Sequence, residues 1–95
     1  MSARWKAIEL EVCRMFGGKR SGPTGKDGPD CVHTEPFAVQ VKHRASVPKW
    51  LTDAMAQAER DAGGDLATLV LHRKGDAVRD SLVIFRLRDF EGWYL

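Results

Sequence analysis

Residues 30–43 read DCVHTEPFAVQVKH, and this stretch decides how the chain is expected to fold. Segments 30–33 and 37–43 read as two strands, because both are rich in apolar residues and the Thr-Glu-Pro between them is typical of a turn. The stretch therefore predicts a β-hairpin. With the turn centred on the glutamate, Asp30 lies opposite Gln40, and opposed residues of an antiparallel pair have Cβ atoms roughly 4.5–5.5 Å apart.

The second segment is expected to divide its side chains between two faces, because side chains alternate along a strand. The apolar face carries Phe37, Val39 and Val41. The other face carries Ala38, Gln40 and Lys42. Asp30 is expected on this second face, so that a carboxylate, an amide and an ammonium group converge there.

This convergence suits metal-assisted cleavage of a phosphodiester, which requires neutralised charge at the phosphate and a hydroxide near neutral pH. Asp30 supplies the strongest ligand for Mg²⁺. The side-chain oxygen of Gln40 and the backbone carbonyl of Val41 are further candidate ligands. Lys42 is expected to contact the attacking water or the scissile phosphate as a point charge. Each residue also fits an ordinary role in a turn, a strand or the surface, so the argument for a site rests on their combination.

Residues 4–16 carry apolar side chains at helical spacing, and Gly17-Gly18 follows them as helix-ending glycines do. The pattern predicts a helix. At about 100° per residue, Glu9 projects close to the apolar stripe of this helix and is expected to face the protein or a site. There it would bind the metal through water or hold a second metal. A solvated carboxylate at the edge of the stripe is the alternative.

The rest of the chain predicts a mixed α/β protein with a single domain, residues 1–95. The glycine-rich residues 17–28 indicate a flexible loop or an irregular edge strand. Residues 48–62 indicate a second helix, 66–72 a central strand covered on both faces, and 81–87 a further strand. An aromatic tail follows, which is expected to pack on the core or to cover a subunit interface: Phe90, Trp93 and Tyr94.

Cysteine usage and hydropathy favour a cytoplasmic protein. Cys13 and Cys31 lack the paired spacing of a zinc site and are expected to be reduced, buried thiols. No apolar run of about 18 residues and no signal-peptide core occur in the sequence, so neither membrane insertion nor secretion is indicated.

The formal net charge is only +2, but basic residues gather in short clusters. Such clusters suggest a polyanion such as DNA as the partner, although each of them also fits an ordinary solvated surface. The candidate DNA contacts among the basic residues are Lys19, Arg20, Lys26, His43, Arg44, Arg73 and Lys74.

Pro29-Asp30 together with Gln40-Val41-Lys42 resembles the motif of the PD-(D/E)xK nuclease superfamily, a Pro-Asp followed after a spacer by an acidic residue two positions before a lysine. The resemblance implies a restriction-endonuclease-like core (αβββαβ) with a mixed central sheet flanked by helices. Within the superfamily the chain looks most like Holliday-junction resolvase-type enzymes and their small phage and bacterial relatives. The shared features are Glu9, the glycine-rich loop and Gln57, which thereby becomes a further candidate DNA contact.

The resemblance implies a Mg²⁺-dependent endodeoxyribonuclease, with Mn²⁺ as a substitute, that acts on branched DNA as a homodimer in a bacterial or phage-infected cell. One departure matters, because Gln40 stands where the superfamily has an acidic residue, and the affinity for the metal should fall. Natural tolerance of the amide, a weakened enzyme and an engineered substitution all stay open. The alternative functions are a DNA-binding module of the same fold that has lost the chemistry and a phage structural or interaction protein.

Overall fold

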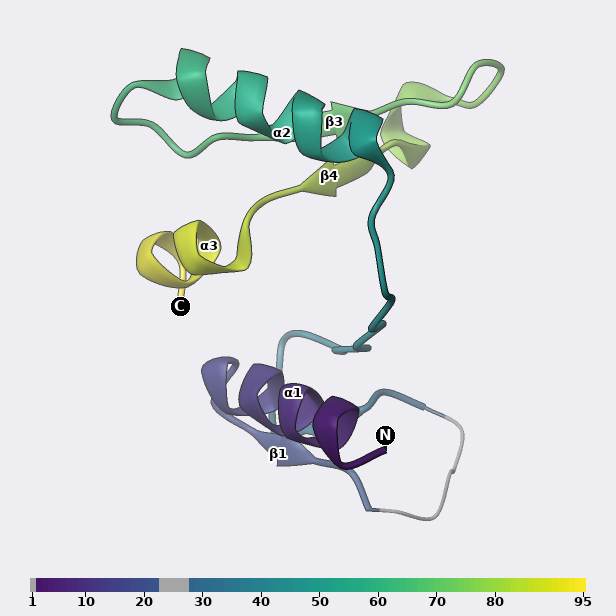
Figure 1. The fold of residues 1–95 in the computed structure, drawn as a ribbon, viewed down its shortest axis with the longest axis vertical. Helices are drawn as coiled ribbons and strands as arrows, with labels where there is room; N and C mark the ends of the chain where they lie inside the picture. Colours follow the sequence, from purple (N-terminus) through teal and green to yellow (C-terminus); the bar gives the residue numbers. More distant parts are fainter. Residues whose placement is uncertain (1, 23–27) are drawn as a thin grey trace. The chain divides into compact units, whose positions relative to one another are not determined.

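Figure 1 shows the computed structural model of the chain, which describes residues 2–22 and 28–95. The chain divides into two compact units, Met1–Ala45 and Ser46–Leu95, which we call the first unit and the second unit. Each unit combines α-helix with a two-stranded antiparallel sheet. The mixed α/β class predicted from the sequence is therefore confirmed.

The first unit begins with α1 (Ser2–Met15), which confirms the helix predicted over 4–16. Its end follows from its two glycines. Gly17 adopts φ +85° and donates its N–H to the carbonyl of Arg14, and the N–H of Gly18 donates to the carbonyl of Cys13. These bonds satisfy carbonyls that the end of a helix otherwise leaves without partners.

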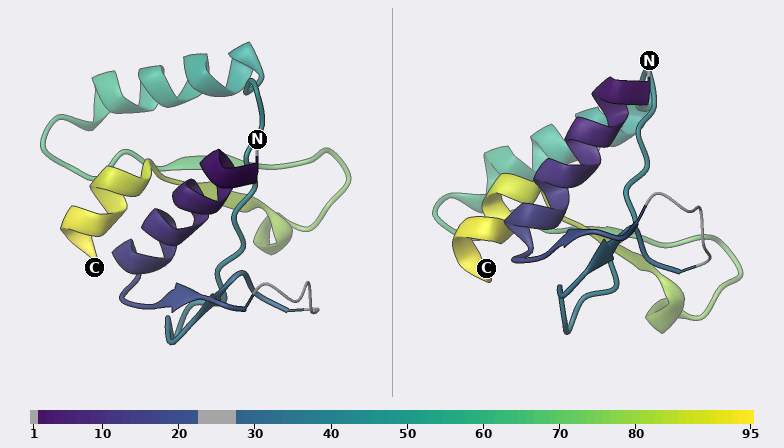
Figure 2. Two further views of the ribbon diagram at one scale, coloured as in Figure 1. Left: turned by 60° about the horizontal axis from the view of Figure 1, so that its bottom comes forward. Right: turned by 90° about the horizontal axis from the view of Figure 1, so that it is seen from below.

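The sheet of the first unit pairs β1 (Lys19–Arg20) with β2 (Cys31–Val32) in antiparallel fashion. Figures 1 and 2 both show α1 lying against β1. Gly18 allows the close approach of the two strands, because a Cβ at this position would overlap the carbonyl oxygen of Val32. Of the flexible loop or irregular edge strand predicted over 17–28, an edge strand is present as β1, and residues 23–27 lie outside the described residues.

The hairpin predicted for residues 30–43 is wrong, because β2 pairs with β1 and residues 37–43 join no strand. The predicted turn is correct. The N–H of Phe37 donates to the carbonyl of Thr34 over 2.8 Å, and the Thr34 hydroxyl donates to the carbonyl of Phe37 over 2.7 Å. The peptide bond before Pro36, inside this turn, is cis. The turn therefore forms, but it does not connect two paired strands as predicted.

A disulfide lies at the centre of the first unit's small core. Cys13 of α1 and Cys31 of β2 form it, with Cα atoms 5.4 Å apart, and they are 0% and 3% exposed. The prediction of reduced thiols is therefore wrong. A sequence separation of 18 residues carries no spacing signal, but the helix and the returning strand bring the two Cα atoms within the range that a disulfide needs.

Residues 37–43 present one side to this core. Val39 is buried, and Phe37 and Val41 pack against the disulfide-containing cluster. The residues that alternate with them are exposed, namely Ala38, Gln40 and Lys42. The two faces predicted from the sequence are confirmed, although the segment reaches the core from a position outside the sheet.

The second unit starts with α2 (Lys49–Ala62), which confirms the helix predicted over 48–62. Pro48 is its N-cap, and Gly63 ends it at φ +60°. In Figures 1 and 2, α2 lies along one side of the strand pair that follows it, and it buries Met55.

That strand pair consists of β3 (Leu69–Leu71) and β4 (Leu82–Ile84), shorter forms of the strands predicted over 66–72 and 81–87. A short 3₁₀ helix, η1 (Val78–Asp80), lies in the connection. The expectation of a central strand covered on both faces is wrong. The sheet has two strands, and the opposed residues Val70 and Val83 are each 56% exposed, because α2 covers only one side of the pair.

The aromatic tail forms α3 (Leu87–Trp93) and its following residue. Phe90 stacks between Phe85 and Tyr94, with ring centroids 5.5 Å apart on both sides. Trp93 and Tyr94 are 70% and 57% exposed, so packing of the whole tail on the core is wrong, whereas the alternative that the tail covers a subunit interface stays a prediction. Across the described residues 2–22 and 28–95, no helix has the length and apolar character needed to cross a membrane.

Candidate functional site

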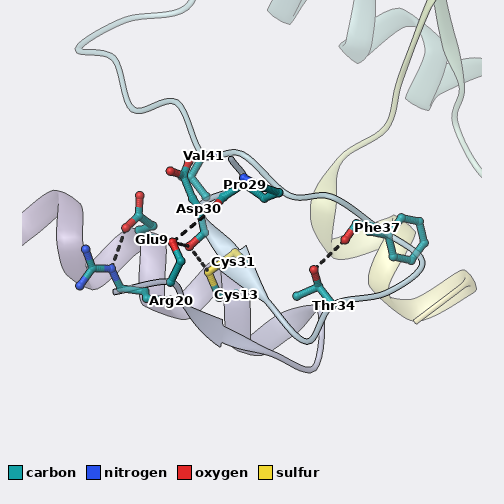
Figure 3. The surroundings of a disulfide bond; sticks show 10 residues. Glu9, Cys13, Arg20, Pro29, Asp30, Cys31, Thr34, Phe37 and Val41 are labelled. Carbon is teal, nitrogen blue, oxygen red and sulfur yellow. Dashed lines mark hydrogen bonds and ion pairs between the residues drawn. A yellow bond between two sulfur atoms is a disulfide. The ribbon is translucent and has the colours of Figure 1, made fainter. Parts of the chain in front are cut away.

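Asp30 lies directly beside the segment that carries the other candidate site residues. Its backbone N–H donates to the carbonyl of Val39 over 2.8 Å, and its carboxylate Oδ2 accepts the N–H of Val41 over 2.7 Å. Figure 3 shows Asp30 and Val41 next to the disulfide. The predicted hairpin implied that Asp30 contacts residues 39–41. Asp30 does contact them, through one hydrogen bond of its backbone and one of its side chain.

The backbone of Asp30 is also fixed from its other side. Its carbonyl accepts the N–H of Ser21 over 2.9 Å and the Ser21 hydroxyl over 3.2 Å. The Sγ of Cys13 lies 3.8 Å from the same oxygen, a contact and not a hydrogen bond, because a disulfide sulfur has no proton to donate. Asp30 therefore has a defined backbone position between β1 and residues 39–41.

Glu9 faces inward from α1, as its place beside the apolar stripe predicts, and it is only 4% exposed. The Nε of Arg20 donates to its Oε1 over 2.6 Å, and the Arg20 side chain is 26% exposed. A buried carboxylate needs such a partner, because removal from water strongly disfavours an unpaired charge. Arg20, a candidate DNA contact in the sequence, is thus joined to Glu9 across α1 and β1 (Figure 3).

The oxygen atoms near Asp30 that accept no hydrogen bond define what this region can bind. Among the described residues, Oδ1 of Asp30 and the backbone carbonyl of Val41 accept no hydrogen bond. Gln40 beside them is exposed, and its amide oxygen is a further neutral donor atom. Carboxylate, amide and carbonyl oxygens are the ligands that Mg²⁺ prefers, so this donor set fits a hard divalent cation.

The same donor set is poor in charge. No group of three or more His, Cys, Asp or Glu side chains that could hold a metal occurs in the part of the chain that the structure describes. Glu9 already neutralises Arg20. Any metal bound here would therefore depend on Asp30 as its main anionic ligand, and Lys42, which is exposed, would remain free to meet a phosphate.

The candidate DNA contacts other than Arg20 fall into three groups. Lys19, His43 and Arg44 are exposed in the first unit. Gln57, Arg73 and Lys74 are exposed in the second unit. Lys26 lies outside the described residues.

Sequence reasoning missed several residues that shape these regions. Ser21 and Val39 act on Asp30 through backbone groups, which no side-chain pattern reveals. In the second unit, Trp50 was seen only as part of a helix, yet it lines a cavity of about 520 Å³ together with charged residues of the β3–β4 connection. The available signal was a tryptophan at the start of an amphipathic helix.

Comparison with known proteins identifies no relatives. No protein-family model matches this chain, and neither a curated protein nor a solved structure matches it.

Proposed function

We propose that this chain is a Mg²⁺-dependent endonuclease that hydrolyses phosphodiester bonds in branched or otherwise structured DNA. The observation that carries the proposal is the bond of 2.7 Å between the Val41 N–H and the carboxylate of Asp30. The Asp30 carboxylate thus lies next to Val41, which Gln40 and Lys42 flank in the sequence. Its other oxygen, Oδ1, accepts no hydrogen bond from the described residues. The resemblance of these residues to the PD-(D/E)xK motif gives the arrangement its chemical interpretation.

The residues divide the work as follows. A bound divalent ion supplies charge neutralisation at the phosphate and a hydroxide near neutral pH. Asp30 would hold the ion, and the side-chain oxygen of Gln40 and the carbonyl of Val41 would serve as neutral ligands. Lys42 presents its ammonium to the scissile phosphate or the attacking water. Glu9, which is paired with Arg20, would be the second carboxylate of the site and would act on the ion through water.

The proposal includes a substrate, an assembly and a fold. A chain of 95 residues contacts phosphates more easily than it reads base edges, so recognition of DNA shape is favoured over recognition of sequence. Symmetric incision of a four-way junction requires two sites, so the active form would be a homodimer. The fold would be a form of the restriction-endonuclease-like core in a single domain, with two two-stranded antiparallel sheets in the described residues in place of one mixed sheet. The Cys13–Cys31 disulfide removes the argument for a cytoplasmic location that rested on reduced thiols.

Incubation of the full chain with a synthetic four-way junction tests the proposal. With Mg²⁺ or Mn²⁺ we expect nicks near the branch point, which EDTA abolishes and which are absent from a linear duplex of the same sequence. Asp30→Asn should abolish cleavage, because the amide retains a hydrogen-bond acceptor for Val41 but loses the charge that holds the ion. Asp53→Asn, at an exposed carboxylate of α2, is the matched control. If no branched, nicked or single-stranded DNA is cut in a metal-dependent way, the proposal is wrong.

Two observations favour a second candidate, a DNA-binding module without catalysis. Gln40 contributes no charge, and Glu9 is committed to Arg20. Such a module would bind DNA in a salt-sensitive manner through its exposed basic residues but would not cleave it when metal is added.

A further inference from the structure

The second unit contains a cavity whose lining differs from that of the candidate nuclease site. The opposed residues Leu71 and Leu82, at one end of the β3–β4 pair, contribute its apolar surface. Trp50 enters from the first turn of α2, and Leu82 is itself 60% exposed. Its volume of about 520 Å³ falls in the range of small-molecule sites, roughly 300–1,000 Å³.

The polar part of the lining is held in place by its own hydrogen bonds. Arg73 donates from Nε and Nη2 to the two carboxylate oxygens of Asp76, over 3.0 and 3.2 Å. The ring Nε2 of His72 lies 2.9 Å from the carbonyl of Asp76, and the N–H of Asp76 donates to the carbonyl of Arg73 over 3.0 Å. Gly75 permits this turn with φ +93°. The connection therefore presents its side chains from an organised loop.

Two planar side-chain groups in this lining are exposed and can contact a ligand. Trp50 is 54% exposed, and the Arg73 side chain is 84% exposed although two of its nitrogen atoms are engaged by Asp76. Nucleobases stack on aromatic rings and on arginine guanidinium planes. An apolar floor with an indole and a guanidinium group at its edge suits a flat heteroaromatic ring.

The charges of the lining argue against a bare phosphate as the ligand. Asp76 offsets Arg73, and Asp80 of η1 adds a second carboxylate, which accepts no hydrogen bond and forms no ion pair among the described residues. A nucleobase edge carries both donors and acceptors, so it can use the carboxylate and the guanidinium together. Because Asp76 is paired with Arg73, the lining keeps the negative charge of Asp80, which would repel a phosphate.

We propose that this cavity binds one unpaired nucleobase of DNA, stacked on Trp50, with its edge facing Arg73 and Asp80. The inference rests on the proposed DNA substrate and specifies it, because structured DNA with a flap, a bulge or an opened branch point exposes unpaired bases that a continuous duplex hides. Lys74, exposed next to Arg73, is available to the neighbouring phosphate. The site does not require a metal, so it can be tested separately from cleavage.

The first experiment is photocrosslinking of the full chain, in EDTA, to a duplex that carries one unpaired 5-iodo-2′-deoxyuridine. The same duplex with this base paired is the control. We expect a crosslink only with the unpaired base, on the peptide that contains Trp50 when the product is mapped by mass spectrometry. A crosslink confined to peptides that contain Trp5 or Trp93, or equal crosslinking of both duplexes, overturns the proposal.

The second experiment measures affinity for the same two duplexes. Trp50→Ala should weaken binding of the unpaired-base duplex by roughly 5- to 150-fold, the effect of losing one base–aromatic stack, and leave the paired duplex unchanged. Trp50→Phe should retain most of the affinity because it keeps a ring. Trp93→Ala is the matched control, since Trp93 is exposed in the same unit and does not line this cavity. Equal losses on both duplexes, or no loss on either, contradict the proposal.

The outcomes separate this inference from the proposed function. A chain that prefers the unpaired base through Trp50 but never cuts DNA with Mg²⁺ refutes the nuclease and supports the base site. A chain that cuts a four-way junction with no dependence on Trp50 does the opposite.

Discussion

The Cys13–Cys31 disulfide joins the helix that carries Glu9 to the strand that follows Asp30. Glu9 lies one helical turn before Cys13, and Asp30 directly precedes Cys31. Both candidate carboxylates are thus attached to elements that one covalent bond holds together (Figure 3). The geometry of the candidate site therefore depends on the oxidation state of these two cysteines.

Removing the disulfide should destabilise the first unit. Cys13→Ala combined with Cys31→Ala removes the cross-link that restricts the unfolded chain. For a loop of 18 residues, the free energy of unfolding should fall by about 3 kcal/mol. Hydrogen exchange followed by mass spectrometry should show faster exchange in α1 and β2. A dithiol reductant should reproduce the change in the wild type, as its two thiols are oxidised and the two cysteines reduced. The same reductant should leave the double variant unaffected, and unchanged exchange in α1 contradicts the prediction.

Gly18→Ala should destabilise the first unit because the new methyl group has no space. A Cβ at this position would overlap the carbonyl oxygen of Val32 and lie 2.6 Å from Cγ2 of Thr34. Overpacking of this kind typically costs about 1–3 kcal/mol, and here the obstacle is backbone, so we expect a loss at the upper end of that range. Gly22→Ala is the control, since a Cβ there would meet no atom of the described residues within 4 Å. Urea unfolding of both variants provides the measurement, and equal midpoints disprove the role of Gly18.

The helices and the turn could be predicted from the sequence because their determinants are local. Gly17 and Gly63 end α1 and α2 where the apolar spacing stops, and the turn before Phe37 forms as its proline predicts. The strand partner could not be predicted in this way. Residues 37–43 were expected to pair with β2, but β1 pairs with it instead, and the close approach of β1 and β2 depends on Gly18 having no Cβ.

In the candidate site, too, the features with local determinants were predicted and the contacts between distant segments were not. The inward direction of Glu9 and the alternation around Gln40 follow from helical and strand periodicity, and both were predicted. The ion pair of Glu9 with Arg20 and the bond from the Val41 N–H to Asp30 join residues distant in sequence. Periodicity within one segment contains no information on which residues of another segment it meets, so these contacts appear only in the structure.

The Glu59–Arg86 pair should make the second unit sensitive to acid. The Nε of Arg86 donates to Oε2 of Glu59 over 2.6 Å, and this hydrogen bond lowers the pKa of the Glu59 carboxyl from its ordinary value. A lowered folded-state pKa contributes stability that is complete above the unfolded pKa of about 4.3 and is lost as the pH falls through the folded value. Glu59→Gln should therefore be less stable than the wild type at pH 7, and the difference should disappear in acid.

Urea unfolding at pH 7 and at about pH 3 measures this difference. Asp53→Asn is the control in the same helix, because its pair with Lys49 is highly exposed and such pairs contribute little. A gap between wild type and Glu59→Gln that stays constant over the acid range contradicts the linkage.

Arg20→Gln should leave Glu9 as a buried carboxylate without its ionic partner. Glu9 is 4% exposed, whereas the Arg20 side chain is partly in contact with water. The free energy of unfolding should therefore fall by about 1–3 kcal/mol, less than for a fully buried pair. The double variant Glu9→Gln with Arg20→Gln should recover part of this loss, because no unpaired charge remains. Thermal or urea unfolding compares the three proteins, and a double variant less stable than Arg20→Gln would show that the charge is not the cause.

Gln40→Glu should separate the enzyme from the non-catalytic DNA-binding module. The exposed side chain of Gln40 neighbours Val41, whose N–H binds Asp30, so a carboxylate at position 40 adds a second negative ligand near Oδ1 of Asp30. If the remaining site is competent, metal-dependent cleavage of a four-way junction should rise at least tenfold, and calorimetry should show tighter Mn²⁺ binding. Glu35→Gln, which removes an exposed carboxylate from the nearby turn, is the control and should leave both unchanged. Tighter Mn²⁺ binding without cleavage supports the module, whereas no change in Mn²⁺ affinity means that Asp30 and residue 40 do not share an ion.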